Sequence, residues 1–286
     1  AALVTPRLDA GDTLIAGFHA QALERARDLY RALPDAVIAE GVLQLEQAPR
    51  DVTRFDKIAA QDLWPADAMT RLDVHAAASC LGDTVQNGGL MMAGALALRP
   101  AAVLEPWLAS AERLTARVAA LQPQGQGWRL ADADGATVIE ADAVVLTAGW
   151  GSAKLTGDWA PELGLAPVAG QADWVEGPTT PPVAWGGYAV PTGTGLLFGA
   201  THDRGRTDRE PTVEASARNL ATLAAALPAL AARAEAAGPT QTRMAVRATT
   251  PDRLPVAGPL AASGLYALTG LGSRGFCVAP LLGEHL

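Results

Sequence analysis

The sequence predicts an α/β protein, α+β in its overall composition, in which helices alternate with strands. Three observations predict this class. Apolar residues recur at helical spacing over residues 13–33, several short strands are separated by glycine-containing turns, and residues 143–148 form a continuous apolar run that ends at Gly149. Such a run is typical of a central strand that is covered on both faces.

The first third of the chain is predicted to begin with an amphipathic helix over residues 13–33. Asp12 is the candidate N-cap, and Pro34 ends the periodic pattern. The elements that follow are strands over residues 36–46 and 89–98 and a helix over residues 101–110, which opens after Pro100.

The middle of the chain is predicted to form antiparallel strands. Apolar and polar residues alternate over residues 114–120, and a second strand lies around residues 128–131. The dipeptide Asp134-Gly135 is a strong hairpin signal, and the next strand starts at Thr137.

The last part is predicted to contain a strand pair over residues 184–200 and a helix over residues 212–227, which is preceded by Pro211. The alanine-rich residues 221–237 also have a helix-forming composition. A short strand over residues 265–269 then leads through a glycine turn into a helix that starts near Phe276.

The composition limits the classes of protein to consider. The 286-residue chain is 49% apolar, so it can bury a sizeable core. Its longest apolar stretch, residues 88–98, is too short to span a bilayer, and residues 1–7 do not resemble a signal peptide. Two cysteines form no metal-ligand spacing. We therefore expect a cytoplasmic protein with no metal. The net charge of −8 argues against a strongly basic nucleic-acid surface, although a local patch could still dock RNA.

A glycine-rich turn near the end carries the clearest functional signal. Its residues fit the pattern G-x-G-x-x-G: Gly270, Leu271, Gly272, Ser273, Arg274 and Gly275. Too few residues follow for a complete dinucleotide-binding unit. Glycines still let the backbone approach a ligand, and a helix that begins there presents free N–H groups to electron-rich oxygen. The alternative is a tight strand–helix connection without a ligand.

Two segments resemble the D-amino-acid-oxidase-like FAD oxidoreductases. Residues 264–275 (GLYALTGLGSRG) resemble the C-terminal flavin-contact segment of that family, and residues 247–258 (RATTPDRLPVAG) resemble the segment before it. The pattern is similar in particular to the FAD-dependent oxidase domain of the bifunctional tRNA 5-methylaminomethyl-2-thiouridine biosynthesis enzymes. Weaker similarity to the same family covers residues 2–9, 143–155, 187–191 and 199–201.

The resemblance implies FAD as cofactor and two interleaved domains. It implies a flavin-binding domain, with a central parallel sheet and a β-meander, in residues 1–35, 106–160 and 248–286. It also implies an antiparallel-sheet substrate domain in residues 36–105 and 161–247. The family's first nucleotide-binding βαβ unit is expected to precede residue 1, outside this sequence. Ala169 stands where relatives usually have a basic residue.

The resemblance also implies roles for individual residues. Arg247 is the candidate clamp for a substrate carboxylate, because its planar fork pairs bidentately with an acid. The alternative is a structural arginine that pairs with Asp252 or with a surface carboxylate. Tyr188 is the candidate hydroxyl partner, or else a half-buried strand tyrosine. Residues 270–275 are expected to contact the flavin. Arg274 could instead face substrate or a tRNA phosphate.

Four further residues are assigned with their alternatives. Val118 and Gly149 are candidate backbone contacts to the cofactor, or else plain sheet core. His202 either lines the pocket or lies in a solvated loop. Cys277 is interpreted as a packed small residue rather than a reactive thiolate.

The reaction implied by the resemblance is oxidative removal of the carboxymethyl group from carboxymethylaminomethyl-uridine at the wobble position of tRNA, which releases glyoxylate. The parent chain is expected to carry a fused methyltransferase. Two alternatives remain open: an oxidase of a free small amino acid such as glycine or sarcosine, and a non-catalytic fragment of such an enzyme.

Overall fold

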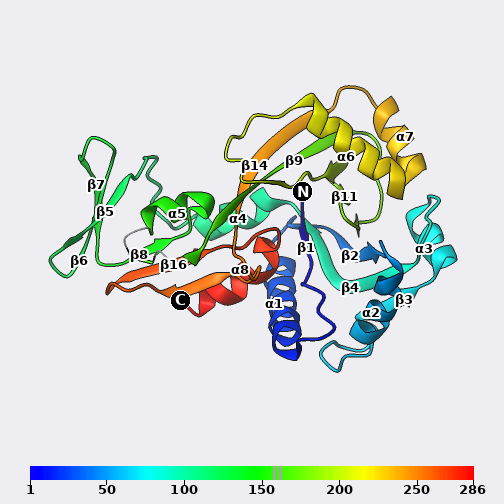
Figure 1. The fold of residues 1–286 in the computed structure, drawn as a ribbon, viewed down its shortest axis with the longest axis horizontal. Coiled ribbons are helices and arrows are strands. Elements are labelled where there is room, and N and C mark those ends of the chain that lie inside the picture. The colour runs from blue at the N-terminus through cyan, green and yellow to red at the C-terminus, as the bar shows by residue number, and fades with distance from the viewer. Residues whose placement is uncertain (157–158, 161–162) are drawn as a thin grey trace.

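A large mixed sheet dominates the computed structural model, which describes residues 1–156, 159–160 and 163–286 (Figure 1). Its ten strands include a path in the order β1-β4-β2-β10-β11-β12-β9-β13, with β14 paired to β9 and β3 paired to β4. Every recorded pair in this sheet is antiparallel except β2 with β10. The strands are β1 (Ala2–Val4), β2 (Val37–Leu45), β3 (Met69–Leu72), β4 (Gly89–Leu98), β9 (Ala166–Glu176), β10 (Val183–Ala184), β11 (Tyr188–Pro191), β12 (Gly195–Gly199), β13 (Asp203–Arg204) and β14 (Gln241–Thr249).

Two three-stranded sheets complete the β structure. One has the order β15-β16-β8, in which β16 and β8 are parallel. The other is the meander β5-β6-β7, which projects at the left end of the molecule in Figure 1. The parallel strands and the meander predicted from the sequence are therefore present. These strands are β5 (Ala120–Gln124), β6 (Gly127–Ala131), β7 (Thr137–Ala141), β8 (Val144–Leu146), β15 (Val256–Pro259) and β16 (Leu265–Thr269).

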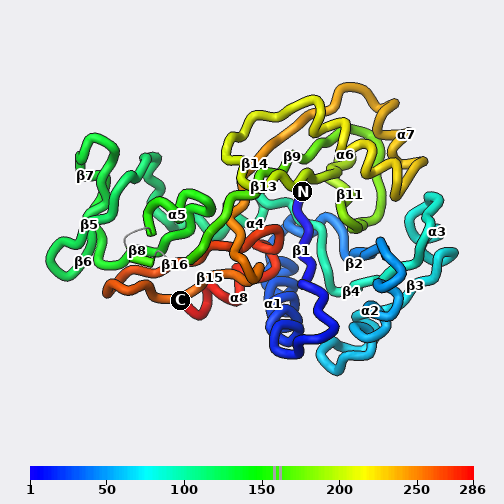
Figure 2. Tube along the Cα trace, in the orientation of Figure 1, coloured from blue at the N-terminus to red at the C-terminus, as the bar shows by residue number. Residues whose placement is uncertain are grey.

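The helices cover the sheets and join distant parts of the chain. Helices α6 and α7 cover the large sheet, where Leu223 and Leu230 pack in one buried cluster with Leu196. Helix α1 lies beside α8, as the trace shows (Figure 2), and the Tyr30 hydroxyl donates to the Phe276 carbonyl at 2.8 Å. The helices are α1 (Thr13–Arg31), α2 (Pro49–Ala59), α3 (Val74–Leu81), α4 (Pro100–Leu108), α5 (Ser152–Leu155), α6 (Val213–Ala226), α7 (Pro228–Ala236) and α8 (Gly275–Glu284), with a 3₁₀ turn η1 (Gly149–Gly151).

Several local signals are confirmed. The Asp12 carboxylate accepts from the amides of Leu14 and Ile15, so it caps α1 as predicted. Gly135, at φ +80°, lies in the turn between β6 and β7. Residues 100–108 form the helix expected after residue 100.

Two predictions were wrong. Residues 114–119 form no strand, and β5 begins only at Ala120, because the strand is defined by its pairing with β6. The apolar run at residues 143–148 is not covered on both faces. Its strand β8 is at the edge of its sheet, and Val145 is 49% exposed.

No helix in the described ranges is both long and apolar enough to cross a membrane.

Candidate functional site

A cleft of about 840 Å³ lies where the end of β14, strand β13, the loop after β1 and the glycine turn before α8 meet. It contains Arg247 together with five of the six residues of the predicted glycine turn. Its lining residues include Arg7, Asp9, His19, Arg54, Val168, His202, Arg204, Arg247, Thr249, Arg253, Gly270, Leu271, Gly272, Ser273 and Arg274. Residues separated by more than 240 positions therefore share one cavity.

Arg247 lies at the cleft wall, and no carboxylate among the described residues forms an ion pair with it. It lies on β14 opposite Val168 of β9, and its guanidinium covers Gly170. Its Nη1 is buried and has no hydrogen-bond partner among the described residues. Burial lowers the pKa of the guanidinium. The described part of the chain shows no ion pair between Arg247 and Asp252.

Tyr188 and His202 are both close to Arg247, but only His202 lines the cleft. Tyr188 lies on β11, opposite Gly199 of β12. Burial raises the pKa of the Tyr188 phenol, and Arg247 acts in the opposite direction. Burial, followed by the charge of Arg247, lowers the pKa of His202. Of the two, His202 is the side chain that the cleft exposes to a ligand.

Only some of the backbone amides in the glycine turn are free to bind a ligand. Gly270 and Gly272 have φ values of +68° and +57°, which favour glycine. The Gly272 amide donates to the Ala248 carbonyl at 3.1 Å, and the Arg274 amide donates to Leu271. Among the residues described, the amides of Ser273 and Gly275 have no recorded acceptor. Gly275 opens α8 and does not line the cleft.

Arg274, in the turn, and Cys277, just after it, are held inside the protein. The Arg274 guanidinium donates to the backbone and hydroxyl oxygens of Thr5, at 3.4 and 3.0 Å, while it also lines the cleft. Cys277 is fully buried, and burial raises the pKa of its thiol to about 12 although Arg274 acts to lower it. Cys277 is therefore a packed thiol, as interpreted from the sequence.

Val118 and Gly149 do not line the cleft. Val118 packs against a buried cluster of the meander and small sheet, which includes Trp128 and Val144. Gly149 has φ +57°, and its carbonyl accepts from the Thr269 hydroxyl at 3.2 Å. The cleft thus does not join these two residues to the glycine turn.

Most of the charge in the cleft comes from residues that carry no signal in the sequence. Six arginines line it (Arg7, Arg54, Arg204, Arg247, Arg253 and Arg274), and Asp9 is the one carboxylate among the described lining residues. Asp9 itself pairs with Arg7 at 3.5 Å. Although the whole chain has a net charge of −8, this cavity is strongly cationic. Such a cavity favours anionic ligands.

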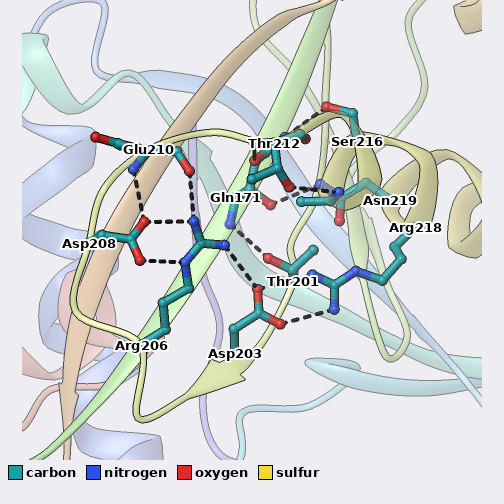
Figure 3. Close-up of polar contacts among 11 residues, drawn as sticks. Gln171, Thr201, Asp203, Arg206, Asp208, Glu210, Thr212, Ser216, Arg218 and Asn219 are labelled. Atoms are coloured by element: carbon teal, nitrogen blue, oxygen red, sulfur yellow. Dashed lines mark hydrogen bonds and ion pairs between the residues drawn. The ribbon is translucent and has the colours of Figure 1, made fainter.

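The other face of β9 carries a buried polar network, shown in Figure 3. Successive side chains of a strand point to opposite faces, so Gln171 lies on the face away from Gly170. The Gln171 side chain donates to the Ser216 hydroxyl at 2.7 Å and accepts from the Thr212 amide at 2.8 Å. Buried Asp173 accepts from Ser216 at 2.7 Å and from Asn219. Helix α6 is thereby fixed to the strand that supports Arg247.

The residues of the cleft fit a flavin cofactor beside an acidic substrate. The unpaired Ser273 amide in the glycine turn suits the electron-rich edge of an isoalloxazine ring, and the buried Nη1 of Arg247 suits a carboxylate. The class defined by this fold and cleft is a flavoprotein oxidoreductase. The FAD dependent oxidoreductase family matches residues 1–286, and the chain belongs to this family. This confirms the family resemblance and the FAD cofactor inferred from the sequence.

Two named relatives match the whole length of this chain. The chain is 51% identical over 287 residues to the tRNA 5-methylaminomethyl-2-thiouridine biosynthesis bifunctional protein MnmC of Caulobacter vibrioides, with 100% of this chain and 47% of the relative covered. It is 38% identical over 289 residues to the protein of the same name from Maricaulis maris, with 100% and 44% covered. The chain spans about half the length of these relatives.

Solved structures show the same fold. Glycine oxidase from Geobacillus kaustophilus superposes with a TM-score of 0.81 at 20% identity, covering 99% of this chain and 81% of the other. Iminodiacetate oxidase from Chelativorans sp. BNC1 gives a TM-score of 0.76 at 22% identity, covering 99% and 82%.

Proposed function

We propose that the protein oxidises the carbon–nitrogen bond of a carboxymethylamino group, and that this group belongs to carboxymethylaminomethyl-uridine in tRNA. The observation that carries the proposal is the buried guanidinium of Arg247, which has no described protein carboxylate and lies in the same cleft as the glycine turn. Arg247 would bind the carboxylate of the substrate and so hold the adjacent carbon in place.

The chain's residues supply position and electrostatics for this reaction. When bound, FAD supplies the hydride acceptor. Arg247 fixes the acid end of the substrate, and Tyr188 is the proposed hydroxyl partner behind it. The amide of Ser273, which lines the cleft, would stabilise developing negative charge next to it. Loss of hydride from carbon and of a proton from nitrogen gives an imine, which water hydrolyses to the aminomethyl nucleoside and glyoxylate.

The cleft supports a tRNA substrate over a free amino acid. Arg204 and Arg253 line the cleft and are exposed. Neither forms an ion pair with another described residue. A free amino acid needs one carboxylate clamp, whereas a nucleotide also presents phosphates. The relatives named for tRNA biosynthesis favour the same substrate. A free amino acid is the second candidate substrate, because the fold is similar to that of glycine oxidase.

The organisation of the parent protein is part of the proposal. We propose that residues 1–35, 106–160 and 248–286 form the flavin-binding portion and that residues 36–105 and 161–247 form the substrate portion. The parallel pair β8–β16 and the meander support the first, and the antiparallel sheet supports the second. A fused methyltransferase fits relatives twice as long as this chain, and the exposed Val145 face of β8 would pack against the first βαβ unit.

The test uses the full-length parent and tRNA that carries carboxymethylaminomethyl-uridine. Mass analysis of the nucleosides should show conversion to aminomethyl-uridine, and glyoxylate should appear in equal amount. Arg247→Ala should raise KM and lower kcat/KM. The loss of transition-state binding free energy should be about 2–4 kcal/mol, as expected when one partner of a buried charge pair is removed. Arg233→Ala, at an exposed position of helix α7, is the matched control and should leave both unchanged.

Three outcomes separate the alternatives. Turnover of glycine or sarcosine, but not of the tRNA, would support the free amino acid oxidase. A colourless preparation of this chain that takes up no FAD would support the non-catalytic fragment. Unchanged kinetics of Arg247→Ala would exclude the clamp.

A further inference from the structure

A buried histidine that the proposed reaction does not use lines the cleft. His19 lies on helix α1, is 2% exposed, and belongs to the lining together with Gly272 and Arg274. Its ring meets Phe18 edge-on, with centroids 5.0 Å apart. The remaining inward positions of α1 are apolar core residues, among them Ala22 and Leu23.

Neither nitrogen of this imidazole has a hydrogen-bond partner among the described residues. Both Nδ1 and Nε2 are buried. Buried side-chain polar atoms are nearly always paired, and an unpaired one costs about 1–3 kcal/mol. A cavity directly beside the ring provides a place for a partner that is not part of the chain.

The charges around His19 determine which form of the ring meets that partner. Burial, followed by the guanidinium groups of Arg274 and Arg7, lowers its pKa to about 4, and Asp9 acts weakly in the other direction. The ring is therefore neutral at pH 7, with one N–H donor and one acceptor nitrogen. The arginines beside it can bind anionic or carbonyl oxygen but cannot accept a hydrogen bond.

We propose that His19 is a ligand-contacting residue, whose N–H donates a hydrogen bond to a carbonyl or carboxylate oxygen bound next to Arg274. Two ligands present such an oxygen: the pyrimidine carbonyls of the flavin and the carboxylate of the substrate. The second source rests on the proposed function, whereas the first requires only the FAD-binding family. His19 is separate from the Arg247 clamp because it comes from α1 rather than from the large sheet.

The test compares His19→Phe and His19→Gln in the full-length parent, with His75→Gln, at an exposed position of α3, as the control. His19→Phe keeps a flat ring and removes the donor, while His19→Gln restores an N–H. We expect His19→Phe to weaken FAD binding, or to raise the substrate KM, by about tenfold, and His19→Gln to recover most of the loss. His75→Gln should match wild type.

The two sources are distinguished by separate measurements. A change in FAD dissociation constant and in the visible flavin spectrum assigns the flavin carbonyl. A change in KM with unaltered FAD binding assigns the substrate carboxylate. Wild-type values of all three in His19→Phe would overturn the proposal. If the parent does not oxidise the tRNA, the KM measurement fails with the proposed function, but FAD binding still decides.

A second measurement does not depend on the variants folding. The chain has four histidines, so the imidazole resonances of wild type can be followed by NMR. Addition of FAD, or of the substrate to the FAD-bound protein, should shift the His19 resonance and leave His75 in place. In full-length protein whose visible spectrum shows bound FAD, an unshifted His19 resonance in both titrations would contradict a ligand contact.

Discussion

The guanidinium of Arg247 lies directly on the backbone of Gly170. A Cβ atom on Gly170 would be 2.6 Å from Nη2 and 2.7 Å from Cζ, and closer still to Nη1. The two residues are on paired strands, since Arg247 of β14 is opposite Val168 of β9. The absence of a side chain at position 170 is therefore what allows the cation to lie flat against the sheet.

This contact makes Gly170→Ala a test of the clamp position. The added methyl group must displace the guanidinium, so KM for the carboxylated substrate should rise by about tenfold or more, which is about 1.4 kcal/mol. The loss of folding free energy should be smaller than the loss of substrate binding free energy, because the Arg247 side chain is free to move toward the cleft. Steady-state kinetics of the full-length parent measure the effect, and an unaltered KM would show that the arginine acts elsewhere.

The two left-handed glycines of the turn should respond differently to alanine. Both substitutions incur the backbone cost of about 1–2 kcal/mol. At Gly270 the new Cβ also lies 3.0 Å from Thr250 Cγ2, whereas at Gly272 the nearest atom, Thr249 Cγ2, is 4.0 Å away. Gly270→Ala should therefore destabilise the fold more in urea unfolding.

Gly272→Ala should mainly weaken FAD binding, because its methyl group enters the open cleft. Gly135→Ala, at φ +80° in the hairpin remote from the cleft, controls for the backbone cost. Equal FAD affinity in Gly272→Ala and Gly135→Ala would argue against a cofactor contact at the turn.

The polar network behind β9 should contribute measurably to stability. Asn219 is 4% exposed and donates to Asp173 and to the Gln171 carbonyl. Asn219→Ala leaves buried acceptors unpaired and should lower the free energy of unfolding by about 1–3 kcal/mol. Arg218→Ala, one residue earlier on α6, breaks an ion pair whose arginine side chain is 56% exposed, and should cost at most about 1 kcal/mol. Equal losses in urea denaturation would contradict the buried network.

His19 should make the fold sensitive to acid. Its pKa is lowered from 6.5 to about 4, first by burial and then by Arg274. Between these values the unfolded chain binds a proton that the native state does not, so stability falls as the pH decreases from about 6.5 to 4. The contribution is about 2–3 kcal/mol. Comparison of wild type with His19→Gln at pH 7 and pH 4.5 isolates it, since the variant lacks this titration; parallel losses in both would exclude it.

Elements with local signals could be predicted from the sequence. Asp12 and the helical spacing after it defined α1, and the glycines after β16 defined the turn into α8. Strands β9 and β14 were missed because their alanine, glycine and polar residues carry little β-propensity. Their nine-residue pairing across about 75 positions forms them instead, and no local pattern reports such a contact.

The candidate site, too, was predicted only in part. The family motifs contained Arg247 and the glycine turn, and the structure brings these into one cleft. His19 has no local signal, because a lone histidine on an amphipathic helix looks like any other interfacial residue. Its significance comes from Arg274, which lies 255 positions later and packs beside it only in the folded chain.

The hydrogen bond from the Gly272 amide to the Ala248 carbonyl has a consequence for substrate choice. It joins the main chain directly after Arg247 to the glycine turn that is proposed to contact the flavin ring. The end of β14 and the turn are therefore held together. The distance between the proposed carboxylate clamp and the proposed flavin site is then set by this backbone contact and by the length of the Arg247 side chain, rather than by a hinge. Evolution toward longer or shorter acids would have to change the reach of the side chain at position 247, and could not do so by sliding one element past another.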